Sequence, residues 1–189
     1  NKATHRHRYG ADVSYWATMG YYEVMEKLRK ACPEVVLENC SSGGSLKDFG
    51  VIQRTHYTVA TDTLSNLPNR QSFYDSTFAF PPLCLQAYTY DRLFNATGDE
   101  RGDFFWRTGM MGSWQICPAE SSQWTEAEKE SARRAAAIYK QWIRPILQDV
   151  KVHHILARPD GVNWDGVFYW SPSLRKGTVF IFRPGSDLS

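Results

Sequence analysis

The sequence predicts an α/β fold in which parallel strands alternate with helices. Short apolar runs alternate with amphipathic stretches along most of the chain, and several of these runs end in polar residues that could carry chemistry. Active sites of (β/α)8 barrels are built at such carboxyl ends of strands. The chain has 189 residues, whereas a whole barrel takes about 250. We therefore expect the C-terminal half of a (β/α)8 TIM barrel.

The first predicted element is an amphipathic helix of about 18 residues. Apolar residues recur at near-helical spacing, and Pro33 helps to end the helix. The repeating residues are Val13, Trp16, Tyr22, Met25 and Leu28.

Strands and helices then follow one another up to residue 148. A last, long helix is expected over 125–148, because Thr125 and Glu128 have the spacing of a capping box. Pro145 should interrupt its last turn. Before it, we expect strands at 35–37, 56–60, 83–88 and 113–117, helices at 68–78 and 103–111, and a loop at 41–45.

The character of the sequence changes after Val150. The β-rich runs 167–170 and 178–182, separated by the turn-forming segment 171–177, predict antiparallel structure. We therefore place a partial barrel at 1–150 and the start of a C-terminal β-sandwich domain at 151–189.

The composition argues against several classes of partner. The net charge is only +2, and the one basic cluster, at residues 5–8, is too short for a nucleic-acid footprint. No apolar run reaches the roughly 18 residues of a membrane span. Four widely spaced cysteines without a Cys-x-x-Cys pair predict free, buried thiols and no metal site. They are Cys32, Cys40, Cys84 and Cys117.

The two ends of the chain look like cuts. The first residue, Asn1, is not Met, and no signal-peptide pattern follows it. The last residues come shortly after an apolar strand. The cellular compartment is therefore left unassigned.

The most informative stretch follows the first expected strand and reads L-E-N-C-S-S-G-G-S over residues 37–45. It lacks the lysine of a P-loop and the Gly-x-Ser-x-Gly of a nucleophile elbow. A cysteine phosphatase loop would place an arginine where Leu46 stands. A tight strand-to-helix turn with small residues stays open as a purely structural alternative.

This stretch resembles a known family. Glu38 to Ser45, followed by 48–50, is similar to the E-x-C-S-S-G-G segment of glycoside hydrolase family 36 α-galactosidases. Residues 61–63 with Arg70-Gln71 resemble that family's S-D-N-T-D…R…Q segment, although the second aspartate of the motif is absent from 64–66. Residues 109–112 and the helix 125–148 resemble its last barrel unit. The resemblance spans nearly the whole chain.

The resemblance implies a double-displacement hydrolysis with retention, without metal or organic cofactor. It gives Asp62 the role of acid and then base, and it places Cys40 and Gly43 at the sugar. Glu38 would contact the sugar or support the site. The nucleophile of the family lies in a K-x-D-x-N strand end before the first helix here, of which Asn1-Lys2 would be the remainder. On this reading the nucleophile is missing from the chain.

Physical chemistry agrees with this role of Asp62. A general acid must hold its proton at working pH, and a neighbouring anionic nucleophile raises its pKa. In retaining enzymes the two carboxyl groups lie about 5–5.5 Å apart, which suits neighbouring strand ends. The alternative is that Asp62 caps the following helix.

We therefore expect an enzyme that cleaves terminal α-galactosides, with a galactoside or oligosaccharide as its partner and neither nucleic acid nor membrane. Two alternatives stay open. The first is a relative that acts on α-N-acetylgalactosaminides or transfers galactose. The second is a non-catalytic carbohydrate-binding module on the same scaffold. Whether the full-length protein is a homo-oligomer also stays open.

Overall fold

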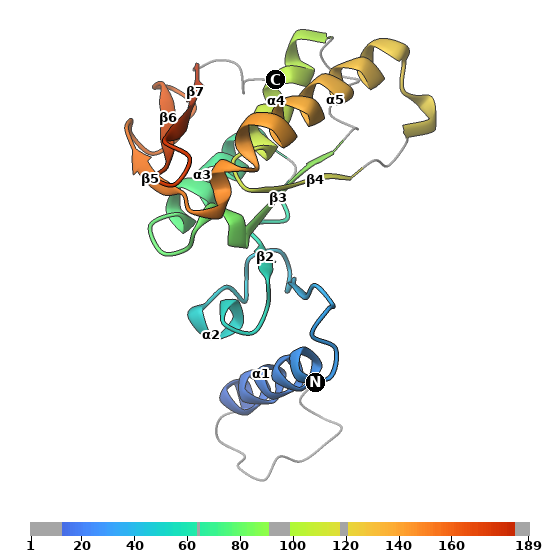
Figure 1. Cartoon of the computed structure of the whole chain (residues 1–189), viewed down its shortest axis with the longest axis vertical. Coiled ribbons are helices and arrows are strands. Elements are labelled where there is room, and N and C mark those ends of the chain that lie inside the picture. The colour runs from blue at the N-terminus through green and yellow to red at the C-terminus, as the bar shows by residue number, and fades with distance from the viewer. Residues whose placement is uncertain (1–12, 64, 91–98, 118–120, 184–189) are drawn as a thin grey trace.

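The structure is a computed structural model that describes residues 13–63, 65–90, 99–117 and 121–183. The described residues form a four-stranded sheet followed by a three-stranded sheet (Figure 1). The elements are α1 Val13–Ala31, β1 Glu38–Asn39, α2 Phe49–Ile52, β2 Tyr57–Val59, α3 Asn66–Ser76, β3 Leu85–Tyr90, α4 Asp99–Gly109, β4 Ser113–Cys117, α5 Glu126–Ile138, β5 Lys151–His154, β6 Asp165–Ser171 and β7 Lys176–Phe182. Asn1-Lys2 and the basic cluster at 5–8 lie outside the described residues.

The first sheet is parallel and follows the order of the sequence. Its strands lie in the order β1-β2-β3-β4, and every neighbouring pair is parallel. The helices α2, α3 and α4 connect successive strands, and α5 follows the last one. This is the arrangement of half a (β/α)8 barrel, so the predicted fold class is confirmed.

The second sheet is antiparallel, as predicted, and is joined to the first by a buried ion pair. Arg70 in α3 donates from Nε to Oδ1 and from Nη2 to Oδ2 of Asp165, both at 2.9 Å. The Arg70 side chain is 1% exposed, and its guanidinium lies over the rings of Phe104 and Phe182. A bidentate pair of this kind fixes β6 against α3.

One continuous apolar core lies under both sheets. It contains Phe73 of α3, Trp106 of α4 and Tyr169 of β6, each at most 1% exposed. The most N-terminal residue of this core is Ala60. Because the two sheets share this core, the division into domains at residue 150 stays a prediction.

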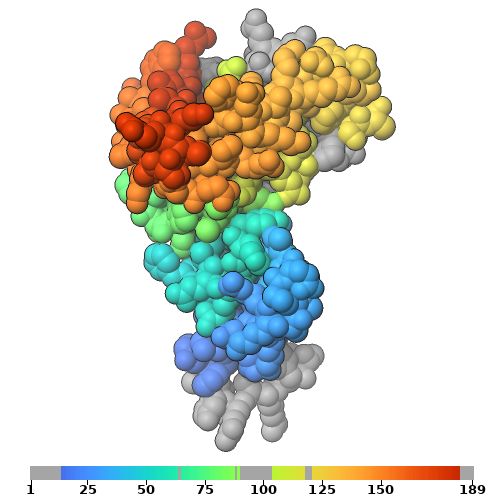
Figure 2. Space-filling model, in the orientation of Figure 1, coloured from blue at the N-terminus to red at the C-terminus, as the bar shows by residue number. Residues whose placement is uncertain are grey.

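The part before Ala60 is narrower (Figure 2). Among the described residues, those before Ala60 contribute no fully buried side chain to this core. Helix α1 matches the predicted helix, but its apolar residues remain largely accessible, with Tyr15 at 53% and Trp16 at 45% exposed. Among the helices of the described residues, none is long and apolar enough to cross a membrane.

Two predicted elements are wrong in detail. Residues 35–37 are not a strand, because a turn after Pro33 leaves Val35 and Val36 exposed and the strand begins only at Glu38. The long helix begins with the predicted capping box at Thr125, but its α-helical part ends at Ile138. A π-helical turn over Tyr139–Ile143 follows and ends two residues before Pro145.

Candidate active site

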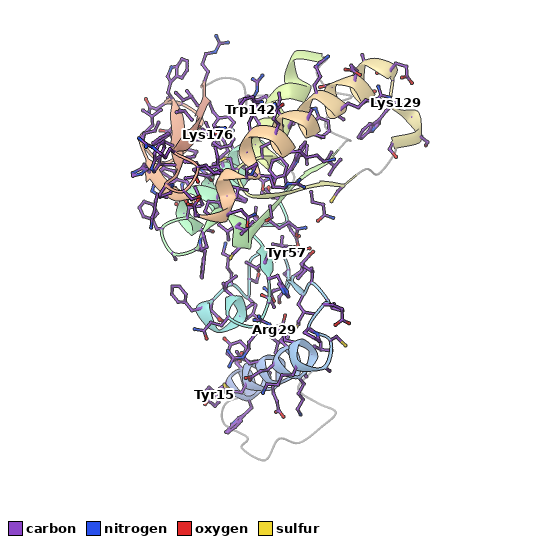
Figure 3. The ribbon with its side chains drawn as sticks, in the orientation of Figure 1. Tyr15, Arg29, Tyr57, Lys129, Trp142 and Lys176 are labelled. Atoms are coloured by element: carbon purple, nitrogen blue, oxygen red, sulfur yellow. The ribbon has the colours of Figure 1, made fainter. Side chains whose placement is uncertain are left out.

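The candidate site lies at the carboxyl ends of β1 and β2. The two strands are parallel, with Glu38 opposite Tyr57 and Asn39 opposite Thr58. Tyr57 lies where the narrow and broad parts of the molecule meet (Figure 3). The loops that leave the two strands therefore start side by side, as the family resemblance requires.

The loop after β1 is a left-handed turn that packs on the loop after β2. Ser42 and Gly43 have φ angles of 44° and 67°. A Cβ atom on Gly43 would lie 2.5 Å from the backbone nitrogen of Asp62 and 3.1 Å from its Cγ. On Gly44 it would overlap the carbonyl oxygen of Ala60. Glycine is therefore required sterically at both positions, and the turn brings Gly43 against Asp62.

Asp62 is not the cap of the following helix. The N-cap of α3 is Ser65, three residues further along the chain, so the capping alternative is wrong. Asp62 is exposed. The loop after it is fixed by Thr63, whose carbonyl oxygen accepts a bond of 3.0 Å from the Asn69 amide.

Glu38 and Cys40 flank the buried Asn39 and are both exposed. Tyr57 lies opposite Glu38 on the neighbouring strand. The pKa of the Tyr57 hydroxyl is raised mainly by burial and, to a smaller extent, by its hydrogen bond to Glu38. Cys40 directly follows β1. The structure thus places Glu38 and Cys40 at the strand next to the one that leads to Asp62, and Gly43 packs directly against Asp62.

Asn39 supports the site, and sequence reasoning missed it. Its side chain is fully buried. Its Oδ1 accepts from the Tyr21 hydroxyl at 2.7 Å, and its Nδ2 donates to Leu46 O at 2.6 Å and to Thr58 Oγ1 at 2.7 Å. These bonds tie the glycine turn to α1 and β2. A polar residue within a short strand was the available clue.

The four cysteines and the possible metal ligands are the remaining candidate groups. None of the four cysteines forms a disulfide bond, but Cys40 is exposed and the other three are half-buried, so the prediction of buried thiols is wrong. Among the residues that the structure describes, no three His, Cys, Asp or Glu side chains are grouped to hold a metal ion.

Comparisons with known proteins agree with this geometry. The sequence profile of the melibiase family matches residues 1–149. The α-galactosidase of Escherichia coli is 30% identical over 144 residues, which are 75% of this chain and 20% of that protein. Alpha-galactosidase 2 of Hypocrea jecorina is 24% identical over 195 residues, which cover 100% of this chain and 25% of that protein.

Solved structures share the fold. The galactosidase domain of the α-galactosidase-sucrose kinase AgaSK matches 93% of this chain and 24% of its own, with a TM-score of 0.80 and 20% identity. The Geobacillus stearothermophilus AgaA α-galactosidase, a glycoside hydrolase family 36 (GH36) member in complex with raffinose, matches 96% of this chain and 25% of its own, with a TM-score of 0.81 and 18% identity. The chain thus spans about a fifth to a quarter of these proteins. Because the family profile covers well over half of its residues, the chain belongs to the melibiase family, with the α-galactosidases of GH36 as its relatives.

Proposed function

We propose that the full-length protein containing this chain is a retaining α-galactosidase and that Asp62 is its acid/base. The observation that carries the proposal is the contact between Gly43 and Asp62. These residues belong to the two sequence segments that resemble the family, and the fold brings them together at one edge of the parallel sheet.

The proposed mechanism has two steps. A carboxylate supplied from outside this chain attacks the anomeric carbon, while the protonated carboxyl group of Asp62 donates its proton to the leaving oxygen. The carboxylate of Asp62 then takes a proton from water, which attacks the anomeric carbon and releases the sugar.

The glycine turn forms the wall next to this carboxyl group. Gly43 can pack against Asp62 because it has no side chain, and its backbone and the Cys40 thiol would face ring hydroxyls. Glu38, two residues before Cys40, would contact the sugar or hold Tyr57. Two related AgaA structures contain raffinose and stachyose, which supports an oligosaccharide as substrate.

The test is an Asp62→Asn substitution in the full-length protein, assayed on two substrates. An unactivated α-galactoside such as melibiose needs protonation of its leaving group, whereas a dinitrophenyl α-galactoside does not. We expect the rate of the first step, in which the glycosidic bond is cleaved, to fall about 10²–10⁴-fold on melibiose. The rate of the same step should fall far less on the activated substrate.

An exposed aspartate elsewhere in the chain serves as the matched control. Asp160 lies in the loop between β5 and β6, where it caps its own turn, and Asp160→Asn should leave both rates unchanged. Melibiose cleavage at the unaltered rate by Asp62→Asn would refute the role of Asp62. If the unaltered protein binds galactosides without turnover, it is a binding module, and turnover of only α-N-acetylgalactosaminides would assign the related specificity.

A further inference from the structure

Lys47 lies behind the candidate site and connects three segments. It follows the glycine turn by three residues, and its ammonium Nζ lies 3.1 Å from Ala60 O at the end of β2 and 2.7 Å from Ser76 Oγ in the last turn of α3. The side chain is half-buried. Burial lowers the pKa of this ammonium, and the nearby Asp75 carboxylate partly opposes that shift.

The carbonyl group that Lys47 contacts belongs to the peptide that leads towards Asp62. The N–H of Ala60 still bonds to Gln86 O of β3 at 3.1 Å. Its carbonyl oxygen instead accepts from two side chains, Lys47 and the Ser72 hydroxyl, the latter at 2.9 Å. Two donors satisfy both lone pairs of the oxygen.

The orientation of this peptide determines the direction of the chain after β2. The peptide joining Ala60 and Thr61 is planar, so donors that fix its oxygen also fix the direction in which the chain leaves β2. Gly44 packs against the same oxygen, and Gly43 packs against Asp62, which lies two residues after Ala60. Lys47 therefore acts on both sides of the contact that forms the site.

We infer that Lys47 is a positioning residue for Asp62, holding the end of β2 and the glycine turn in register through the Ala60 carbonyl group. The inference rests on the proposed role of Asp62 as acid/base. Loss of the ammonium would let this peptide rotate and move the Asp62 carboxyl group away from the leaving oxygen. Misplacement of a reacting group by about 1 Å can reduce a rate by about 10²-fold.

The test is Lys47→Met in the full-length protein, because methionine keeps most of the aliphatic stem and removes the donors. We expect kcat/KM to fall about 10–100-fold on melibiose and less than about threefold on the dinitrophenyl galactoside, whose departure needs no acid. A purely structural role would reduce both rates equally. The matched control is Lys129→Met, which removes an ammonium that pairs with Glu126 on the surface of α5 and should change neither rate.

Two serine variants separate the contacts of Lys47. Ser72→Ala removes the other donor to the same carbonyl oxygen and should give a smaller loss that is again selective for melibiose. Ser76→Ala removes a partner of Lys47 but leaves the bond to Ala60, and it should have little effect. If Lys47→Met fails to fold in a thermal melt, Ser72→Ala decides, and an unselective or absent loss in that variant refutes the inference.

The same assays distinguish failure of this inference from failure of the proposed function. Equal losses on both substrates in Lys47→Met, with a selective loss in Asp62→Asn, would refute the role of Lys47 alone. Equal losses in Asp62→Asn would refute the acid/base assignment and the inference together.

Discussion

The part of the molecule before Ala60 and the part after it are stabilised by different interactions. After Ala60, the apolar core runs from α3 through α4 and α5 into β6 and β7. Before it, α1 lies at the narrow end with Tyr15 pointing away from the rest (Figure 3). The contacts that place the loops there are mainly polar, made by residues such as Asn39 and Lys47.

The candidate site lies on the border between these two parts. Asp62 belongs to the part after Ala60, which contains the apolar core, whereas Gly43 belongs to the part before it. A site at such a border depends on a few directional bonds more than on apolar burial. Substitutions in the two parts should therefore have different consequences, and three of them test this difference.

The largest effect on stability is expected in the well-packed part, at the ion pair between Arg70 and Asp165. Asp165→Asn removes the negative charge from this buried ion pair, and we expect the free energy of unfolding to fall by about 3–5 kcal/mol. Urea denaturation of the chain, followed by circular dichroism, measures this loss.

The matched control for this prediction is a second ion pair that joins α3 to the part of the chain that forms the second sheet. Arg158 bonds to Asp75 in a bidentate manner, but both side chains are about half exposed. Arg158→Gln should cost at most about 1 kcal/mol because water screens exposed pairs. Similar losses for the two substitutions would show that burial does not control the strength of this connection.

A smaller effect is expected at Asn39. Asn39→Ala removes three hydrogen bonds in a buried place and should lower the free energy of unfolding by up to about 3 kcal/mol. Tyr21→Phe removes only the bond to Oδ1 and should cost about 1 kcal/mol. The two values from urea denaturation should stand in this order, and a larger loss for Tyr21→Phe would contradict the network.

The smallest effect on stability, but a clear effect on the site, is expected at Gly43. Gly43→Ala places a Cβ at a positive φ and against Asp62, which should cost about 1 kcal/mol or slightly more. Gly20 in α1 has no neighbour within 4 Å of such an atom, so Gly20→Ala should instead stabilise the helix by about 0.5–1 kcal/mol.

The position of Asp62 gives the second measurement for the glycine pair. Gly43→Ala should shift the amide resonance of Asp62 in a nitrogen–proton NMR spectrum, whereas Gly20→Ala should leave it in place. An unmoved Asp62 resonance in Gly43→Ala would contradict the contact between the two loops.

Local sequence patterns predicted the elements whose own residues favour the structure that they form. The strand Ser113–Cys117 lies where it was predicted, and Thr125 and Glu128 form the predicted capping box. The strand expected at 35–37 was wrong because apolar residues next to Pro33 remain in a turn. β5 was missed because its sequence, K-V-H-H, becomes a strand through pairing with β6.

At the site, contacts between residues that are far apart in the sequence could not be predicted from the sequence. The resemblance identified Gly43 and Asp62 as parts of one site, and the structure brings them into contact. Neither the family segments nor local spacing pointed to Lys47, whose partners lie 13 and 29 residues away. The bond between Arg70 and Asp165 spans 95 residues. Such pairs depend on how the helices pack, which no local pattern encodes.

The proposed reaction can be tested most directly with the full-length protein and an aryl α-galactoside, by following the anomeric proton of the released sugar by NMR. The account predicts that α-galactose appears first and that the β-anomer follows by slow mutarotation, because two displacements at the anomeric carbon retain its configuration. Release of β-galactose first, or the absence of hydrolysis, would contradict it.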